Sequence, residues 1–220
     1  MYLFVVGPPG IGKSTLAPAL ASRLGAAVME VDEVVERGAG RSNRETIERD
    51  GMSRFRDLES KALATLPQTP AWTVVDTGGG TPLREANRRR MRQLGLIIGL
   101  RGSLARVTAG IAATMAKRPD QSLSPEERAR HALTDPERVA GYADVDISFD
   151  VEGLSVEQSA TTIATWLATV RGLRIDVGRE HPYPVLVRAG LVDHVGAHVR
   201  ALGWHGRIAL VTEPSVAQRA

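Results

Sequence analysis

The segment "GPPGIGKST", residues 7–15, constrains this chain most, because it directly follows the apolar run "YLFVV". It fits the pattern G-x-x-x-x-G-K-[ST] between a strand and a helix. Glycines let consecutive backbone N–H groups converge on one phosphate, and the helix N-terminus adds positive potential. Lys13 is one of only three lysines, so its place in the pattern is hard to attribute to chance. The segment therefore predicts an α/β fold with a phosphate-binding loop.

The same segment predicts the residues that would bind ATP. Lys13 is expected to neutralise the β- and γ-phosphates, and the Ser14 hydroxyl to ligate Mg²⁺. The ATP-binding set predicted from the loop and the first turn of its helix is Gly7, Gly10, Gly12, Lys13, Ser14 and Thr15. ATP is thus the implied co-substrate and Mg²⁺ the implied cofactor, but the loop does not reveal the phosphate acceptor.

Short apolar runs alternate with helical patterns along the chain. Strands are expected at 2–6, 26–29, 72–75, 96–100 and 145–151. Helices are expected at 14–24, from 32 onward, and at 44–50, 55–66, 83–94, 104–116, 125–132, 136–141 and 156–170. This alternation predicts a five-stranded parallel sheet with helices on both faces. Ligands of such sheets bind beyond the carboxyl ends of the strands.

Composition excludes several classes of protein. The chain has 220 residues, of which 43% are hydrophobic and 24% charged, as in an ordinary globular protein. It has no cysteine, and its net charge of only +3 gives no reason to expect a nucleic-acid partner. The first apolar run is too short for a signal peptide or a membrane span, so we expect a cytoplasmic protein with no membrane partner.

Charged residues follow the second predicted strand and stand at the start of the helix expected at 55–66. Glu30 and Asp32 are two apart at the end of a strand, so on extended backbone both carboxylates would point into one site. Asp32 as a simple helix N-cap is the alternative. Arg54 and Arg56 flank Phe55, and one guanidinium facing the site would suit a carboxylate substrate. A surface arginine is the alternative there.

Four segments taken in order, "GPPGIGKST", "EVDEVVE", "FRDLES" and "TGGG" followed by "REANRRR", resemble shikimate kinase over residues 1 to about 170. The resemblance implies a P-loop fold of the nucleoside-monophosphate-kinase type. It implies that Gly78, Gly79 and Gly80 offer backbone N–H groups to shikimate, and that Asp32 contacts its hydroxyls and accepts the proton. It also implies that Arg56 pairs with the carboxylate of shikimate.

The resemblance assigns three further residues. Glu30 stands where the family normally has an aspartate that helps to hold hydrated magnesium. Arg118 matches the lid arginine that closes on the phosphates. The second carboxylate-binding arginine of the family lies in an R-x-P-L-Y motif that is missing here. "RVAGY" keeps an arginine and a tyrosine four apart, so we assign that role to Arg138, with Arg130 as the competitor.

Residues 171–220 differ in character from the preceding part. "IDVGREHPYPVLVRAGLVDHVG" and "GRIALVTEPSV" resemble the beginning of 3-dehydroquinate synthase. We interpret the chain as a kinase domain, 1–170, followed by an incomplete αβ fragment of a synthase-like domain, 171–220. His194 and His198 have a spacing that zinc can use, but no third ligand is evident, so no metal site is expected there.

Together these features predict transfer of the ATP γ-phosphoryl group to the 3-hydroxyl of shikimate, in the biosynthesis of aromatic amino acids. The implied partners are shikimate, ATP and other enzymes of the same pathway, and we expect a monomer. Two alternatives stay open. One is another small-molecule kinase, acting on a sugar acid such as gluconate. The other is a non-catalytic ATP-binding module that regulates a partner synthase.

Overall fold

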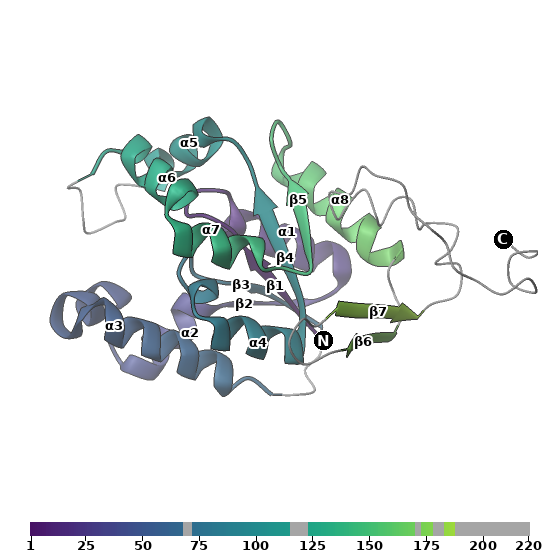
Figure 1. Ribbon diagram of the computed structural model, residues 1–220, viewed down its shortest axis with the longest axis horizontal. Helices are drawn as coiled ribbons and strands as arrows, with labels where there is room; N and C mark the ends of the chain where they lie inside the picture. Colours follow the sequence, from purple (N-terminus) through teal and green to yellow (C-terminus); the bar gives the residue numbers. More distant parts are fainter. Residues whose placement is uncertain (68–71, 115–122, 170–172, 178–182, 188–220) are drawn as a thin grey trace, which may run out of the picture. The chain divides into compact units, whose positions relative to one another are not determined.

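The computed structural model describes residues 1–67, 72–114, 123–169, 173–177 and 183–187 (Figure 1). The chain divides into two compact units, Met1–Thr161 and Thr162–Ala220. The first unit contains the phosphate loop and every site residue described below. Arg118 lies outside the described residues. Residues 188–220, which include His194 and His198, also lie outside them.

The first unit is built on the predicted five-stranded parallel sheet. Its strands are β1 (Tyr2–Val6), β2 (Ala27–Glu30), β3 (Thr73–Asp76), β4 (Gly95–Arg101) and β5 (Ile147–Asp150), in the spatial order β2-β3-β1-β4-β5. All five residues of β1 are buried, as expected of an apolar run at the centre of a sheet covered on both faces. Because the strands are parallel, the phosphate loop and the residues that follow β2 and β3 meet at one edge.

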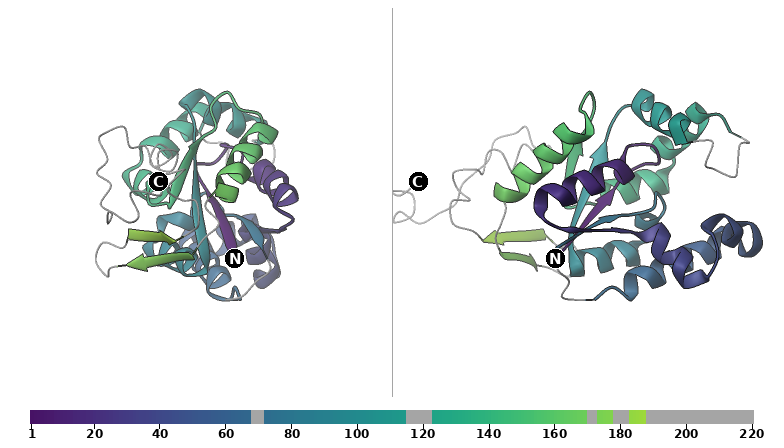
Figure 2. Two further views of the ribbon diagram at one scale, coloured as in Figure 1. Left: turned by 90° about the vertical axis from the view of Figure 1, so that its right-hand side faces the viewer. Right: turned by 180° about the vertical axis from the view of Figure 1, so that it is seen from behind.

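Helices cover both faces of the sheet, which confirms the prediction. Helix α1 (Lys13–Leu24) lies on one face and α4 (Glu85–Leu94) on the other (Figures 1 and 2). The remaining elements of the chain before β6 are α2 (Val31–Ala39), α3 (Asn43–Ala64), the 3₁₀ turn η1 (Thr81–Leu83), α5 (Leu104–Thr114), α6 (Pro125–Thr134), α7 (Pro136–Ala143) and α8 (Val156–Thr169). Helix α8 crosses the boundary between the two units.

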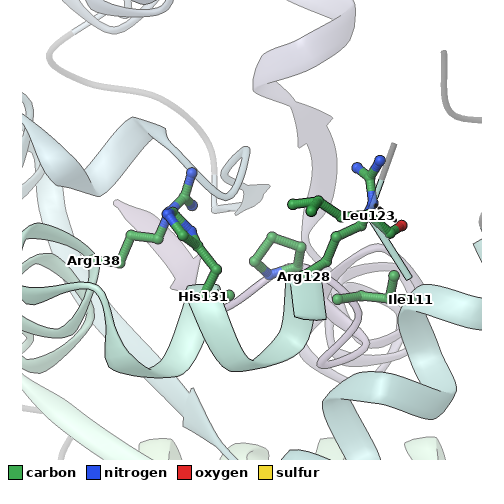
Figure 3. Close-up of a pocket in the computed structure, with 7 residues that line it drawn as sticks. Ile111, Leu123, Arg128, His131 and Arg138 are labelled. Atoms are coloured by element: carbon green, nitrogen blue, oxygen red, sulfur yellow. Dashed lines mark hydrogen bonds between the residues drawn. The ribbon is translucent and has the colours of Figure 1, made fainter. Parts of the chain in front are cut away.

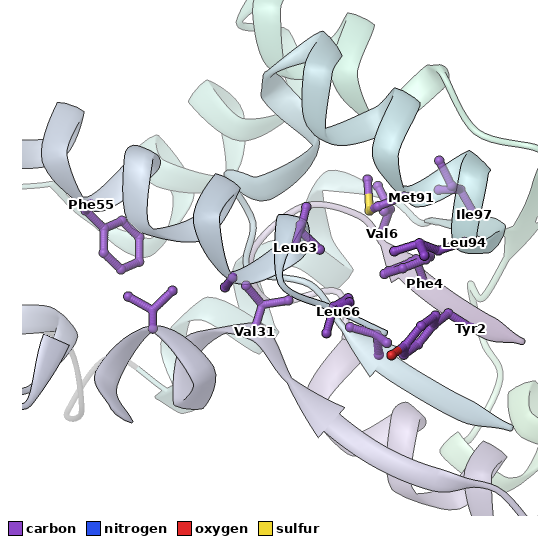
Figure 4. Close-up of a cluster of buried hydrophobic side chains, with 13 residues drawn as sticks. Tyr2, Phe4, Val6, Val31, Phe55, Leu63, Leu66, Met91, Leu94 and Ile97 are labelled. Atoms are coloured by element: carbon purple, nitrogen blue, oxygen red, sulfur yellow. The ribbon is translucent and has the colours of Figure 1, made fainter. Parts of the chain in front are cut away.

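The main hydrophobic cluster explains how α3 is held beside the site. Tyr2, Phe4 and Val6 of β1 pack with residues of α4 and α3 (Figure 4). Phe55 and Leu63 are the α3 residues that this cluster buries most clearly. Burial of one such side chain contributes about 1.5–3 kcal/mol. Phe55 therefore fixes the part of α3 from which the neighbouring Arg56 projects.

The expected helical segments 44–50 and 55–66 both lie in α3 and are separated by a break at Gly51, whose φ of 83° leaves the helical region. One local prediction was wrong. Helix α2 begins at Val31, so Glu30, and not Asp32, occupies the N-cap position. Glu30 and Asp32 are therefore not on one extended segment. Strand β2 ends at Glu30 and helix α2 begins at the next residue, so Asp32 lies in the first turn of the helix.

The second unit contains an antiparallel pair, β6 (Leu173–Val177) and β7 (Tyr183–Val187). Two strands were expected in this part of the sequence. Across the described ranges, no helix is both long and apolar enough to cross a membrane.

Candidate active site

The phosphate loop connects β1 to α1 and has the local geometry that its glycines predict. Gly12, at the N-cap of α1, has a φ of 107°, a conformation that side chains with a Cβ rarely adopt. Lys13 is buried, and its Nζ donates to Gly7 O at 2.9 Å and Pro8 O at 3.1 Å. Ser14 is exposed in the first turn of α1, where a hydroxyl can reach a nucleotide-bound cation.

Each glycine of the triple-glycine segment, Gly78–Gly80, makes room for a different part of the site. A Cβ on Gly78 would lie 2.8 Å from Asp32 Oδ1, and one on Gly79 would lie 3.1 Å from Pro9 Cγ in the phosphate loop. A Cβ on Gly80 would lie only 1.8 Å from Arg56 Cζ. Bare backbone here therefore lets a carboxylate, the phosphate loop and a guanidinium converge on one place.

A buried carboxylate holds Arg56 in that place. Glu59 has no exposed surface, and it accepts hydrogen bonds from Arg56 Nη1 at 2.5 Å and from Thr81 Oγ1 at 2.6 Å. Arg56 retains 17% exposure of its side chain, so part of the guanidinium stays open to the site. The Arg56–Glu59–Thr81 network thus ties α3 to the turn that follows the glycines.

A second chain of hydrogen bonds reaches the glycines from α7. Arg138 Nη1 donates to Tyr142 Oη at 3.2 Å, and Tyr142 Oη donates to Gly79 O at 2.6 Å. Burial raises the pKa of Tyr142, whereas the nearby Arg138 and Arg56 guanidinium groups lower it. Two predicted arginines, from α3 and from α7, therefore lie near one tyrosine at the glycine segment. The competitor Arg130 instead forms an exposed ion pair with Glu126.

A pocket of about 190 Å³ opens beside the phosphate loop (Figure 3). Arg128 and His131 of α6 and Arg138 of α7 give it a basic wall, and Pro9 brings the phosphate loop to it. Arg138 thus borders both this pocket and the Tyr142 hydrogen bond. An anion would be attracted to this side of the site.

Carboxylates gather at the edge of the sheet opposite Lys13. Asp32 keeps contact with solvent, but partial burial of its carboxyl raises its pKa, Glu59 and Glu30 raise it further, and Lys13 and Arg56 lower it. Burial also raises the pKa of Asp76 from its ordinary 3.8 to about 6; Lys13 opposes this shift, and Glu30 and Asp32 add to it. Glu30, Asp32 and Asp76 therefore interact electrostatically with one another or with Lys13.

Sequence reasoning missed the parts played by Glu59 and Asp76 and the contact of Tyr142 with Gly79. Asp76 ends a strand two residues before Gly78, so the rule that selected Glu30 would also have found it. Glu59 lies one helical turn after Arg56 in "FRDLES", a spacing at which side chains meet. The spacing in "RVAGY" linked Tyr142 to Arg138, as the structure shows, but it gave no sign of the contact with Gly79, which is 63 positions away.

The oxygen donors at this edge fit magnesium better than a transition metal, because Mg²⁺ prefers hydroxyl, carboxylate and water oxygens. Ser14 and Glu30 supply such donors. No group of three or more acidic, histidine or cysteine side chains within the described segments is arranged to hold a metal ion. A magnesium ion here would therefore depend mainly on nucleotide phosphates and water.

A model of the family described as shikimate kinase matches residues 9–168. The chain belongs to the shikimate kinase family. As a shikimate kinase family member it is an ATP-dependent kinase, a transferase of the shikimate pathway. A shikimate kinase of Geobacter sulfurreducens is 35% identical over 163 residues, which cover 74% of this chain and 88% of that protein. One of Thermodesulfovibrio yellowstonii is 33% identical over 162 residues, with 73% and 91% covered.

Solved structures agree on the fold of this shikimate kinase family member. The structure described as "Shikimate kinase from Acinetobacter baumannii in complex with shikimate" superposes with a TM-score of 0.67 at 24% identity, and covers 77% of this chain and 94% of that one. The enzyme from Aquifex aeolicus gives a TM-score of 0.61 at 24% identity, with 76% and 96% covered. At this identity the likeness shows the fold alone.

Proposed function

We propose that this protein transfers the γ-phosphoryl group of ATP to the 3-hydroxyl of shikimate. The observation that carries the proposal is the convergence of Arg56, Asp32 and the phosphate loop on Gly78–Gly80, each within reach of a different glycine. A carboxylate-binding cation, a proton acceptor and a phosphate cradle are the three parts that phosphorylation of a hydroxy acid requires. Relatives named shikimate kinase support this choice of acceptor.

The phosphate end of the proposed site is the loop of residues 7–15. Gly7, Gly10, Gly12, Ser14 and Thr15 would surround the phosphates, and the Lys13 ammonium would stabilise charge that develops on the transferred group. Ser14 and Glu30 would hold a hydrated magnesium ion. When bound, that ion neutralises phosphate charge. The resemblance to shikimate kinase also assigns Arg118 to this end, although Arg118 lies outside the described residues.

The acceptor end of the proposed site is the glycine segment with its two arginines. Arg56, whose orientation Glu59 restrains, would pair with the carboxylate of shikimate. Arg138 would do so from the other side, restrained through Tyr142. Backbone N–H groups of Gly78, Gly79 and Gly80 would hydrogen-bond the small ring, since no Cβ intervenes.

Asp32 would orient the attacking hydroxyl and accept its proton. Its raised pKa suits a proton acceptor better than an ordinary aspartate, because a stronger base takes the proton more readily. No covalent intermediate is required, so the site would act through positioning and electrostatic stabilisation.

The test is Arg56→Ala in a coupled assay of ADP release, with shikimate, quinate and gluconate as acceptors. Losing a hydrogen bond to a charged group, about 1.5–3 kcal/mol, should raise the KM for shikimate by roughly 10- to 100-fold. The KM for ATP should change little. Arg44→Ala, on the same helix but in an exposed pair with Glu48, is the matched control and should change neither constant. Equal damage to both substrates, or preference for gluconate, would contradict the proposal.

We also propose that the kinase domain spans 1–170 and that 171–220 begin a dehydroquinate-synthase-like domain. The sequence resemblance and the antiparallel β6–β7 pair support this. Sequencing the native transcript beyond codon 220 tests it. A reading frame that continues into a glycine-rich NAD loop would support the fusion, and a stop codon would contradict it. We further propose that the kinase works as a cytoplasmic monomer, which light scattering and cell fractionation would test.

A further inference from the structure

Asp76 is placed at the phosphate loop by the register of the sheet. It is the last residue of β3, and its Cα partners are Val5 on β1 and Glu30 on β2. Val75 belongs to the core cluster on the α3–α4 face, so Asp76, the next residue, points to the opposite face. Helix α1 packs against β3 on that face, and Lys13 and Ser14 are its first two residues.

The carboxylates of Asp76 and Glu30 are neighbours on this face. Residues that lie side by side on adjacent strands project to the same side of a sheet, and neighbouring strands are about 4.8 Å apart. The electrostatic interactions of Asp76 with Lys13, Glu30 and Asp32 agree with this placement. A long side chain at position 30 and a carboxylate at position 76 thus reach toward the same space above the phosphate loop.

The Asp76 carboxylate is partly buried and has no hydrogen bond or ion pair to any of the described residues. Partly buried anions are costly without a partner, and here two further carboxylates add repulsion. Lys13 offsets only part of this cost, because burial and the carboxylates of Glu30 and Asp32 keep the pKa of Asp76 raised although Lys13 lowers it. The arrangement therefore favours a cation at this point when nucleotide is bound.

We propose that Asp76 is a positioning residue that accepts hydrogen bonds from water molecules on the nucleotide-bound magnesium ion, and that it shares this role with Glu30. In other P-loop proteins a carboxylate at the end of a strand contributes to the magnesium site together with the Ser or Thr of the loop. The inference rests on the proposed function for the identity of the nucleotide, but not for the identity of the acceptor.

The test is Asp76→Asn in the full chain, with calorimetric titration of ADP in the presence and absence of Mg²⁺. The readout is the ratio of the two ADP affinities. Loss of one partner in the outer shell of a metal should lower this ratio roughly tenfold. Metal-free ADP affinity should stay the same or increase, because a negative charge near the phosphates is removed. Glu30→Gln should lower the ratio in the same direction.

Asp150→Asn is the matched control, because Asp150 ends β5 at the same edge of the sheet but is exposed. It should keep the wild-type ratio. An unchanged ratio in Asp76→Asn, or a wild-type ratio near one, would overturn the proposal. An equal loss of both ADP affinities with a lower Tm would overturn it in favour of a structural role. A lower kcat with an unchanged ratio would assign Asp76 to proton transfer instead.

These titrations contain no acceptor. If shikimate proved not to be the substrate, ADP release would fail with shikimate while the magnesium dependence of ADP binding persisted. The two failures are therefore distinguishable.

Discussion

Glu59→Gln is the sharpest test of how the site is held together. The wild-type carboxylate is fully buried and accepts two short hydrogen bonds, from Arg56 and from Thr81. Glutamine keeps the shape of the side chain but has one acceptor oxygen. The least costly arrangement keeps that oxygen toward Arg56 and turns the amide toward Thr81, whose hydroxyl can then accept. The change therefore removes mainly the charge of the Arg56 pair.

The magnitude follows from that pair. A hydrogen bond between charged groups contributes about 1.5–3 kcal/mol, and because the Arg56 side chain keeps 17% exposure we expect a loss of about 1–2 kcal/mol. For a chain of this size that corresponds to a fall in Tm of about 2–8 °C. A loosened Arg56 should also raise the KM for shikimate roughly tenfold, with the KM for ATP nearly unchanged.

Thermal unfolding and the coupled ADP assay measure these two effects. Glu85→Gln is the matched control, because it breaks an exposed glutamate–arginine pair with Arg89 and should cost less than about 0.5 kcal/mol. If Glu59→Gln lowers the Tm but leaves the KM for shikimate unchanged, Glu59 does not orient Arg56, and the reasoning is refuted.

Three further predictions concern the glycines, Tyr142 and Asp76. Gly80→Ala should raise the KM for shikimate at least tenfold, because its Cβ would displace the Arg56 guanidinium. It should also lower the Tm at least as much as Glu59→Gln, because the buried Glu59 carboxylate would lose its cation; kinetics and unfolding together check both effects, and an unchanged KM would contradict the prediction. Tyr142→Phe removes the hydrogen bond to Gly79 O and should lower the free energy of unfolding by about 1 kcal/mol. It should also raise the KM for shikimate more than the KM for ATP; an equal rise in the two KM values would count against a link to the acceptor. The folded-state pKa of Asp76, about 6, lies above its ordinary 3.8, so the folded protein binds the proton of this carboxyl more tightly than the unfolded chain does. The stability gained from this proton is therefore complete below about pH 4 and lost as the pH rises through 6. Denaturant unfolding of the nucleotide-free protein should therefore show Asp76→Asn gaining on the wild type by about 2–3 kcal/mol over this range, and a pH-independent difference would refute the assignment.

The parts of the fold that local sequence encodes were predicted well. The phosphate loop is contiguous, and its conformation follows from glycines at fixed spacing, so the pattern alone predicts where Gly12, Lys13 and Ser14 stand in the loop and the first turn of α1. The strands β1, β3 and β4 are apolar runs that must be buried on both faces. Their alternation with helices leaves few topologies besides a parallel sheet.

Element boundaries were less predictable where two local preferences compete. Gly51 breaks the helical pattern in the sequence, and its backbone breaks α3 at the same place in the structure. Asp32 is a good N-cap residue by type, yet the end of β2 places Glu30 at that position instead. At the start of α2 the position of the strand decided between alternatives that differ little in local free energy.

The sequence by itself determined the kind of chemistry: a loop for nucleotide phosphates, a glycine segment after a strand, and carboxylates and arginines in a fixed order. Only the tertiary structure decided which of these side chains meet. Tyr142 reaches Gly79 because α7 returns to the carboxyl edge of the sheet, and Asp76 stands beside Glu30 because β3 pairs with β2 in one register. Contacts between residues so distant in sequence depend on strand pairing and side-chain packing, which no local pattern records.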